Sequence, residues 1–420
     1  MYHQTTLPNG LRIICETIPS VHSVSMGIWV GTGSRYEEPE LNGISHFIEH
    51  MMFKGTGRRT TKQIAEEIDA VGGQLNAFTT KEYTCYYAKV LNQHYRFGID
   101  LISDMVTNSL FPAEELSKEK QVIMEEIKSF EDSPDEIIHD IFAGTLLKGH
   151  PLGRAILGTP ETVGRIDRET MLGYLSHHYT PDNIVFAVAG NVQFDQIVTE
   201  VSRQFDALQG STRQELVPIP DLQPELAIKS KETEQVHICL GSRGVKRSAP
   251  EKYPIFVLDS ILGGSVSSRL FQQLREERGL VYVAGSNHAA YKDTGIFSIY
   301  AGTSLRYFEE VVSLIKVELD KLQQNPVEER ELTRAKEQLK GNFLLSLESS
   351  CNRMNRIAKI AMFNEALLTP EESVAKIEAV TADQVLNAAR QLFDEKGMVL
   401  SAIGPFDPDS KLLRKPYHEY

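Results

Sequence analysis

The sequence lacks the features that mark membrane and secreted proteins. No apolar run among its 420 residues approaches the roughly 20 residues that a helix needs to cross a bilayer, and the longest are short runs such as Ile184 to Ala189. The four cysteines lie far apart and form no CxxC pair, which favours a reducing compartment over a disulfide framework. Residues Met1 to Gly10 are polar and lack the apolar core of a signal peptide. We therefore expect a cytoplasmic protein that does not enter a membrane.

Basic residues are too few for a general nucleic-acid binder. Lys and Arg number 44 and Asp and Glu number 57, so the formal net charge is −13, which is the wrong sign for binding phosphate backbones. Hydrophobic residues make up 41% and charged residues 24% of the chain, which excludes a disordered chain and a coiled coil. The length predicts two or three globular domains at roughly 150 residues each. As a hypothesis, the acidity would attract basic peptides.

The chain repeats itself at an offset of 214 residues. One apolar strand pattern ends at Gly190 and another at Gly404, and 404 − 190 = 214. A Pro-Ala-Glu-Glu sequence begins at Pro112 and a Pro-Val-Glu-Glu sequence at Pro326, again 214 residues apart. Agreement at one offset predicts two homologous lobes that arose by duplication.

Each lobe is predicted to have an α+β fold. Strand and helix patterns are mixed without strict β-α-β order, which indicates a mostly antiparallel sheet covered by helices. The predicted strands of the first lobe cover Leu11–Thr17, His22–Gly31, Gln74–Thr80 and Tyr83–Val90, and its predicted helices cover Gly43–Lys54, Thr61–Val71, Tyr95–Ser109 and Ala113–Asp132. A proline-rich polar stretch is typical of a linker. The predicted domains are a first lobe at 1–209, the linker at 210–225 and a second lobe at 226–420.

The sequence His46-Phe47-Ile48-Glu49-His50 carries a candidate metal site. Apolar residues around it recur with helical spacing, so His46 and His50 lie one turn apart on one face, where two imidazoles can reach one metal ion. Glu49 flanks the same site. This HxxEH order is that of the inverted zincins, in which the glutamate serves as general base. The alternative is a pair of surface histidines beside a solvated glutamate.

A second predicted helix supplies a third ligand. Glu119 and Glu126 lie two turns apart on its apolar stripe, where an unpaired carboxylate is costly. We assign Glu126 as the third zinc ligand and Glu119 to a supporting position near a ligand or the attacking water. Glu125 points about 100° away from the stripe. The alternative for Glu119 is an ion pair with a lysine at the helix edge.

The second lobe has no equivalent metal site. Adding 214 to His46, Glu49, His50 and Glu126 gives, in that order, Ser260, Gly263, Gly264 and Lys340. None of these residues can replace the ligand or base at the corresponding position. We therefore expect one lobe to carry the chemistry and the other to help enclose a substrate.

With HxxEH on a helix, a glutamate 126 − 50 = 76 positions beyond the second histidine, and a duplicated body, the sequence resembles the pitrilysin family of zinc metallopeptidases. It resembles in particular the mitochondrial-processing-peptidase-like branch of two-lobed subunits. The resemblance spans nearly the whole chain and includes the segments Thr6–Leu11, His46–Thr56, Gly72–Thr80 and Ser267–Tyr282. It implies that His46, His50 and Glu126 hold one Zn²⁺ per chain, that Glu49 activates water and that Glu119 assists.

The resemblance also implies how substrate is bound. Asn76, Ala77 and Phe78 resemble the family's exposed edge strand, to which an extended substrate adds as a further strand. Arg275 and Tyr282 match the arginine and tyrosine that hold the substrate backbone and stabilise the oxyanion. The implied function is a zinc-dependent endopeptidase that cleaves short or unfolded polypeptides in a closed chamber. Since the chain has both residue sets, a homodimer needs no other partner.

Two other functions remain open. The first is a non-catalytic core or partner subunit of the same fold, in which degraded zinc motifs would be expected. The second is a zinc-dependent protein that binds peptides without cleaving them. Four further histidines lack ligand spacing and are interpreted as ordinary residues: His94, His150, His177 and His178.

Overall fold

The computed structural model describes residues 2–221 and 225–407, and the chain divides into two compact units. Unit 1 comprises Met1–Lys128, Arg154–Leu216 and Leu345–Leu367. Unit 2 comprises Ser129–Gly153, Val217–Leu344 and Leu368–Tyr420. Residues 222–224 of the predicted linker and residues 408–420 of the predicted second lobe lie outside the described residues.

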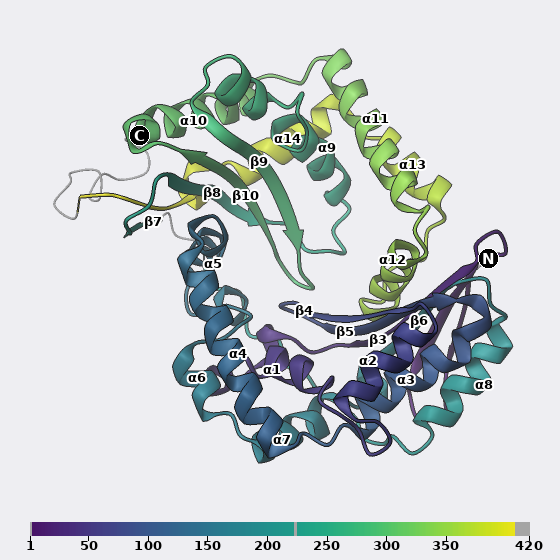
Figure 1. The fold of residues 1–420 in the computed structure, drawn as a ribbon. Coiled ribbons are helices and arrows are strands. Elements are labelled where there is room, and N and C mark those ends of the chain that lie inside the picture. Colours follow the sequence, from purple (N-terminus) through teal and green to yellow (C-terminus); the bar gives the residue numbers. More distant parts are fainter. Residues whose placement is uncertain (1, 222–224, 408–420) are drawn as a thin grey trace. The chain divides into compact units, whose positions relative to one another are not determined.

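Unit 1 contains six strands and most helices of the first half of the chain (Figure 1). Its strands are β1 (Tyr2–Thr6), β2 (Arg12–Thr17), β3 (Ser23–Val30), β4 (Gln74–Thr79), β5 (Thr84–Leu91) and β6 (Ile184–Gly190). Its helices are α1 (Ile44–Met51), α2 (Thr61–Ala70), α3 (Tyr95–Asn108), α6 (Pro160–Arg165), α7 (Arg168–His178), α8 (Phe194–Phe205) and α12 (Ser350–Met362), together with most of α4 (Ala113–Asp132). All eight elements predicted for this region form, with ends that differ by at most a few residues.

The described part of unit 2 contains five strands and the remaining helices. Its strands are β7 (Glu225–Ser230), β8 (Val236–Gly244), β9 (Val281–Ala290), β10 (Gly295–Thr303) and β11 (Val399–Gly404). Its helices are α5 (Pro134–Leu146), α9 (Lys252–Leu262), α10 (Phe308–Gln324), α13 (Pro370–Glu378), α14 (Ala382–Leu392) and most of α11 (Glu329–Ser346). Within the described part of the chain, no helix is both long and apolar enough to cross a bilayer.

The two sheets share one topology. The strand order is β1-β2-β6-β3-β5-β4 in unit 1 and β7-β11-β8-β10-β9 in unit 2. In each sheet one pair of neighbours is parallel, β2 with β6 and β7 with β11, and the other neighbours are antiparallel. The described strands of unit 2 therefore repeat the order of β2 to β6 in unit 1. This confirms the predicted pair of mostly antiparallel, helix-covered lobes.

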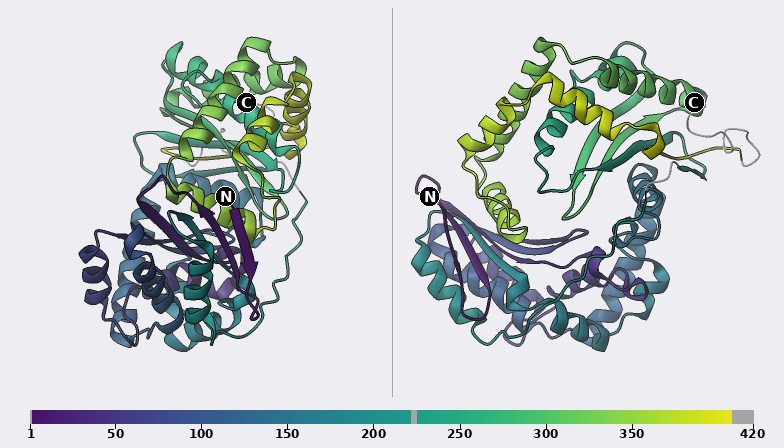
Figure 2. Two further views of the ribbon diagram at one scale, coloured as in Figure 1. Left: turned by 90° about the vertical axis from the view of Figure 1, so that its right-hand side faces the viewer. Right: turned by 180° about the vertical axis from the view of Figure 1, so that it is seen from behind.

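Both faces of the unit 1 sheet are buried against helices. The main apolar core lies between the sheet and helices α1, α3, α7 and α8, and includes Phe47 and Phe186. On the opposite face, Trp29 and Val185 pack against Met354 of α12. The views in Figures 1 and 2 agree that α12, drawn yellow-green, lies against these strands. Successive side chains of a strand point to opposite faces, and here both faces are buried. The central strands are therefore nearly continuous apolar runs.

Helices α5 and α12 are exchanged between the two halves of the sequence. Adding 216 to the ends of α5 gives the ends of α12, since 134 + 216 = 350 and 146 + 216 = 362. Helix α5 precedes the linker but packs on β8 and β11 of unit 2 through Ile138 and Phe142, and α12 follows the linker but packs in unit 1. The predicted lobes at 1–209 and 226–420 instead kept each helix with its own half. An apolar helix face shows that a helix is buried but not which sheet buries it.

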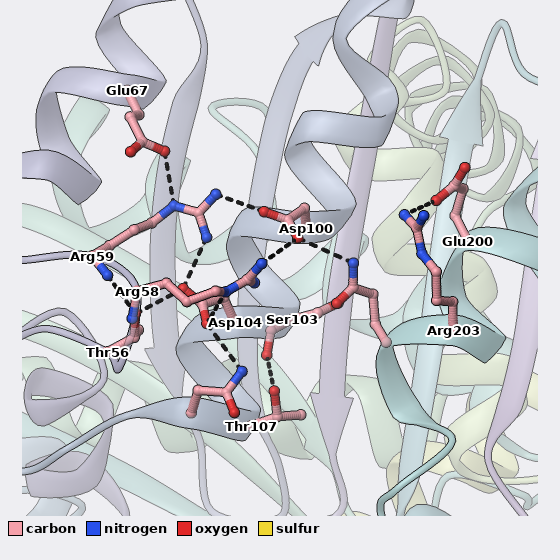
Figure 3. A network of polar contacts seen from close by, with 12 residues as sticks. Thr56, Arg58, Arg59, Glu67, Asp100, Ser103, Asp104, Thr107, Glu200 and Arg203 are labelled. Carbon is pink, nitrogen blue, oxygen red and sulfur yellow. Dashed lines mark hydrogen bonds and ion pairs between the residues drawn. The ribbon is translucent and has the colours of Figure 1, made fainter.

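A polar network centred on the buried Asp104 ties the loop after α1 to α3 (Figure 3). The Asp104 carboxylate accepts hydrogen bonds from Thr56 Oγ1 at 2.7 Å, Arg59 Nη1 at 2.8 Å and Arg58 Nε at 2.9 Å. Arg59 also donates to Asp100 at 2.6 Å. Burial alone would raise the pKa of Asp104, but the hydrogen bonds from Thr56 and the two arginines outweigh it and lower that pKa. The network fixes the chain that leaves α1.

Replacing Asp104 with alanine is expected to lower the free energy of unfolding by about 3 kcal/mol, because two guanidinium groups lose a buried partner. Urea unfolding measures this. Glu200→Ala is the matched control, since its two partners Arg96 and Arg203 are 66% and 70% exposed and exposed pairs contribute less than about 1 kcal/mol. Equal losses in the two variants would contradict the prediction.

The same network predicts a pH dependence. The pKa of Asp104 is lower in the folded chain than its value of about 3.9 in an unfolded one, so its stabilisation is complete above about pH 5 and is lost as the pH falls further. The stability difference between the wild type and Asp104→Asn should therefore shrink between pH 5 and pH 3. A difference that stays constant over this range would refute the assignment.

Candidate metal centre

The start of α1 is held by Glu37, which is buried. Its carboxylate accepts hydrogen bonds from the backbone N–H groups of Gly43 at 2.8 Å and Ser45 at 2.9 Å, and from Asn42 Nδ2 at 2.8 Å. Burial raises the pKa of Glu37, although these three donors oppose the rise. A carboxylate at this position satisfies the free N–H groups of the first helical turn. No local pattern connects Glu37 with α1, and sequence reasoning missed it.

Gly43 allows α1 to begin where it does. Its φ of 98° lies in the left-handed region, and a Cβ atom there would meet the carbonyl oxygen of Leu157 at 2.6 Å. Only glycine avoids both the strain and the clash. The direction in which α1 enters the core is therefore set by Gly43 and Glu37 together.

The predicted ligands come together between α1 and α4. His46 Nε2 lies 3.7 Å from Glu126 Oε1, and His50 Nε2 lies 3.7 Å from Glu126 Oε2. One ligand atom from each of the three residues lies within 4.8 Å of the others. Across residues 2–221 and 225–407, this is the only group of three His, Cys, Asp or Glu side chains so arranged. The motif and the apolar stripe thus predicted residues that meet in space.

The three side chains fit a zinc ion. A separation of 3.7 Å is too long for a hydrogen bond, and ligand atoms around a tetrahedral zinc with bonds of about 2.1 Å lie about 3.4 Å apart. Burial, together with the nearby His50, lowers the pKa of His46 to about 3, so its imidazole is neutral and can bind a cation. Two imidazole nitrogens and one carboxylate form a common ligand set of catalytic zinc sites.

The sequence left two contacts open for Glu119, one near a metal ligand and one with a lysine, and the structure shows both. Its Oε2 lies 3.1 Å from His50 Nδ1, and its Oε1 lies 2.6 Å from Lys54 Nζ. Glu119 therefore supports a ligand and also pairs with a lysine. Sequence reasoning did not identify Lys54, although it follows His50 by four residues and would share its helical face. Glu125 is exposed and pairs with Lys128, as its position off the stripe predicted.

Glu49 is the only one of the three acidic side chains around this site that bonds to the sheet. Its Oε2 accepts a hydrogen bond of 2.5 Å from the hydroxyl of Thr79, the last residue of β4. Burial raises the pKa of Glu49, while the Thr79 hydrogen bond and His50 oppose the rise. A carboxylate with a raised pKa beside a metal site suits a general base. Thr79 was not identified from the sequence.

The predicted substrate-binding residues lie on β4, at the edge of the sheet. The backbone N–H of Ala77 donates to the Asn76 side chain at 2.8 Å. The ring of Phe78 packs edge-on against Trp29, with 5.6 Å between the ring centres. The Phe78 ring thus faces the sheet, while Asn76 is exposed. Thr79 connects this strand to Glu49.

Arg275 and Tyr282 lie together in unit 2. Arg275 belongs to the helical turn at Phe271–Glu276 and Tyr282 to β9. The Arg275 guanidinium lies over the Tyr282 ring, 5.4 Å from its centre, and over the Phe271 ring at 4.9 Å. Tyr282 is 74% exposed, which is unusual for an aromatic residue in a strand. The pair is thus preorganised and accessible in unit 2.

Three positions of unit 2 that correspond to a ligand or to Glu49 have other roles. Ser260 is buried in α9, and Gly263 ends that helix. Lys340 on α11 pairs with Glu337 at 2.8 Å and Glu378 at 2.9 Å. In the described part of unit 2, no three His, Cys, Asp or Glu side chains lie close enough together to hold a metal ion.

Comparison with known proteins connects this site to a family. Residues 12–160 match the model of the insulinase domain of peptidase family M16, and residues 165–339 match the peptidase M16 inactive domain. The uncharacterized zinc protease YmxG of Bacillus subtilis is 43% identical over 409 residues, or 96% of this chain and 98% of that protein. An uncharacterized zinc protease of Streptomyces coelicolor is 40% identical over 410 residues, or 96% of this chain and 89% of that protein.

Solved structures share the fold at low sequence identity. The crystal structure of a peptidase M16 inactive domain from Pseudomonas fluorescens has a TM-score of 0.91 at 19% identity, covering 97% of this chain and 99% of that chain. A protease from Helicobacter pylori has a TM-score of 0.89 at 21% identity, covering 96% of this chain and 99% of that chain. These likenesses confirm the predicted two-lobed α+β fold.

Replacing Glu126 with glutamine is expected to raise the zinc dissociation constant by more than about 100-fold, beyond the effect typical of residues that only support a ligand. Competition with a chromophoric chelator measures the constant. Glu125→Gln is the matched control on the same helix and should bind zinc as the wild type does. Unchanged zinc binding by Glu126→Gln would show that another residue is the third ligand.

Proposed function

Because the chain belongs to peptidase family M16, we propose that it is a zinc-dependent endopeptidase that cleaves short or unfolded polypeptides, with one zinc ion per chain. The observation that carries this proposal is the complete set of His46, His50 and Glu126 with Glu49 beside it. The relatives named zinc proteases support the same activity. A non-catalytic subunit would not need this set to remain intact.

Each residue of the site has its own role in peptide hydrolysis. A zinc ion held by His46, His50 and Glu126 would supply a Lewis acid that stabilises negative charge on the reacting oxygens. Glu49 accepts a proton at its carboxylate from the attacking water and then donates it to the nitrogen of the leaving amine. The buried setting that raises the pKa of Glu49 favours its holding that proton between the two steps. Thr79 keeps the carboxylate oriented.

Substrate recognition is proposed to use the backbone of β4. An extended peptide that pairs with this edge strand would lie along Asn76, Ala77 and Phe78, next to the residue that holds Glu49. The Asn76 side chain, which now accepts from the Ala77 N–H, must move to admit a peptide carbonyl. A folded protein already uses its backbone groups internally, so short or unfolded chains are the substrates that can pair here.

Arg275 and Tyr282 are proposed to bind the substrate backbone and stabilise the oxyanion. Their exposure in unit 2 and the stacking of the guanidinium on the ring support this role, which the family resemblance first suggested. A homodimer belongs to the same proposal, because a chain with both the metal ligands and this pair needs no different partner. A cytoplasmic location is part of it as well.

Replacing Glu49 with glutamine is expected to abolish peptidase activity, with a loss of at least about 100-fold from the missing general base, while zinc binding is retained. Hydrolysis of an unfolded peptide mixture, followed by mass spectrometry, measures the activity, and chelator competition measures zinc binding. Wild-type cleavage should stop on chelation and return with zinc. Substantial turnover by the zinc-loaded variant would reject Glu49 as the base.

Tyr282→Phe is expected to lower kcat by about 100-fold, as removal of an oxyanion donor does, without changing zinc affinity. Tyr307→Phe is the matched control, because Arg306 stacks over the Tyr307 ring in the same unit at 4.4 Å. Steady-state kinetics on one peptide compare the two. If both variants cleave equally well, Tyr282 has no part in catalysis.

A further inference from the structure

Glu119 uses its two carboxylate oxygens for two different partners. Oε2 lies 3.1 Å from His50 Nδ1, and Oε1 lies 2.6 Å from Lys54 Nζ. The Glu119 side chain is 9% exposed, and the side chains of His50 and Lys54 are 23% and 22% exposed. All three groups are thus largely withdrawn from water, where charge-assisted hydrogen bonds are strong and an unpaired carboxylate is costly.

Lys54 is held in position by its own backbone. The chain continues to turn after α1, with the Phe53 N–H donating to His50 O at 3.3 Å and the Lys54 N–H donating to Met51 O at 3.0 Å. Gly55, with a φ of 105°, then redirects the chain. Lys54 therefore comes one turn after His50 on the face that meets α4.

We propose that Lys54 is a positioning residue for the zinc centre and acts through Glu119 on His50. This inference rests on the proposed function. An ammonium on Oε1 restricts rotation of the carboxylate, so Oε2 stays directed at His50 Nδ1. The Nδ1–H then donates to Glu119 and leaves the Nε2 lone pair facing Glu126. Carboxylates in this role orient metal-binding imidazoles and strengthen them as ligands.

A lysine that merely stabilises the fold would give a different result from one that positions a zinc ligand. Such a residue would change unfolding, but its loss would not weaken zinc binding through Glu119. If Lys54 acts through Glu119, the effects of Lys54→Met and Glu119→Gln on zinc affinity are not additive. Arginine at position 54 keeps a cation within reach of Glu119 and should restore most of the affinity.

The experiment measures zinc dissociation constants by chelator competition for full-length variants whose folding is checked by circular dichroism. Lys54→Met is expected to bind zinc about 10-fold more weakly than the wild type, in the range typical of residues that support a ligand. Lys54→Arg should bind nearly as tightly as the wild type. Lys118→Met is the matched control, since Lys118 adjoins Glu119 on α4 but is 65% exposed and pairs with Glu115.

Lys54→Met alone leaves the buried Glu119 carboxylate without its ammonium partner, whereas the double variant removes that charge. The double variant therefore keeps the test decisive if Lys54→Met is unstable. Zinc affinity of Glu119→Gln should not fall further when Lys54 is also replaced by methionine. Wild-type zinc affinity in Lys54→Met, or a further 10-fold loss in the double variant, would overturn the inference and leave the proposed function intact. A wild-type protein that binds no zinc would instead overturn the proposed function.

Discussion

Along the contact between α1 and α4, basic and acidic side chains alternate. His46 and His50 meet Glu126, and His50 and Lys54 meet Glu119. Rising residue numbers on α1 face falling numbers on α4, so the two helices run antiparallel here. Of these two carboxylates on α4, Glu119 is buried and has an imidazole and an ammonium as close partners, whereas Glu126 is 42% exposed and lies 3.7 Å from each imidazole. The metal ligands are thus one part of a longer row of facing basic and acidic groups.

The side chains of α1 can face those of α4 only if α1 keeps its position. Contacts at both ends of the helix hold it there. At its start, Glu37 accepts hydrogen bonds from the first-turn N–H groups of Gly43 and Ser45. Beyond its end, Asp104 binds the two arginines that follow the turn. Neither anchor touches the ligands. Fastening a helix at both ends holds its side chains within the tolerance that a metal site needs.

The candidate site could be predicted from the sequence because its information is local. Two histidines at helical spacing share a face on any helix, and Glu126 differs from Glu125 by its place on the apolar stripe. The strands and helices of the first half were predictable for the same reason. Glu37 could not be found in this way, because two of its three partners are backbone N–H groups, which carry no sequence signal. Strand order and the destinations of α5 and α12 depend on tertiary packing.

Because α5 and α12 are exchanged, unit 1 cannot finish folding until the second half of the chain has been synthesised. Strands of unit 1 are complete once Gly190 has been synthesised, but the face that holds Trp29 stays uncovered until Met354 and its neighbours emerge. Unit 1 ends only at residue 367 of 420. During translation, therefore, an apolar surface of the sheet stays exposed until a distant part of the same chain has been synthesised. Separately expressed halves would each expose such a surface and carry a helix that belongs to the other half.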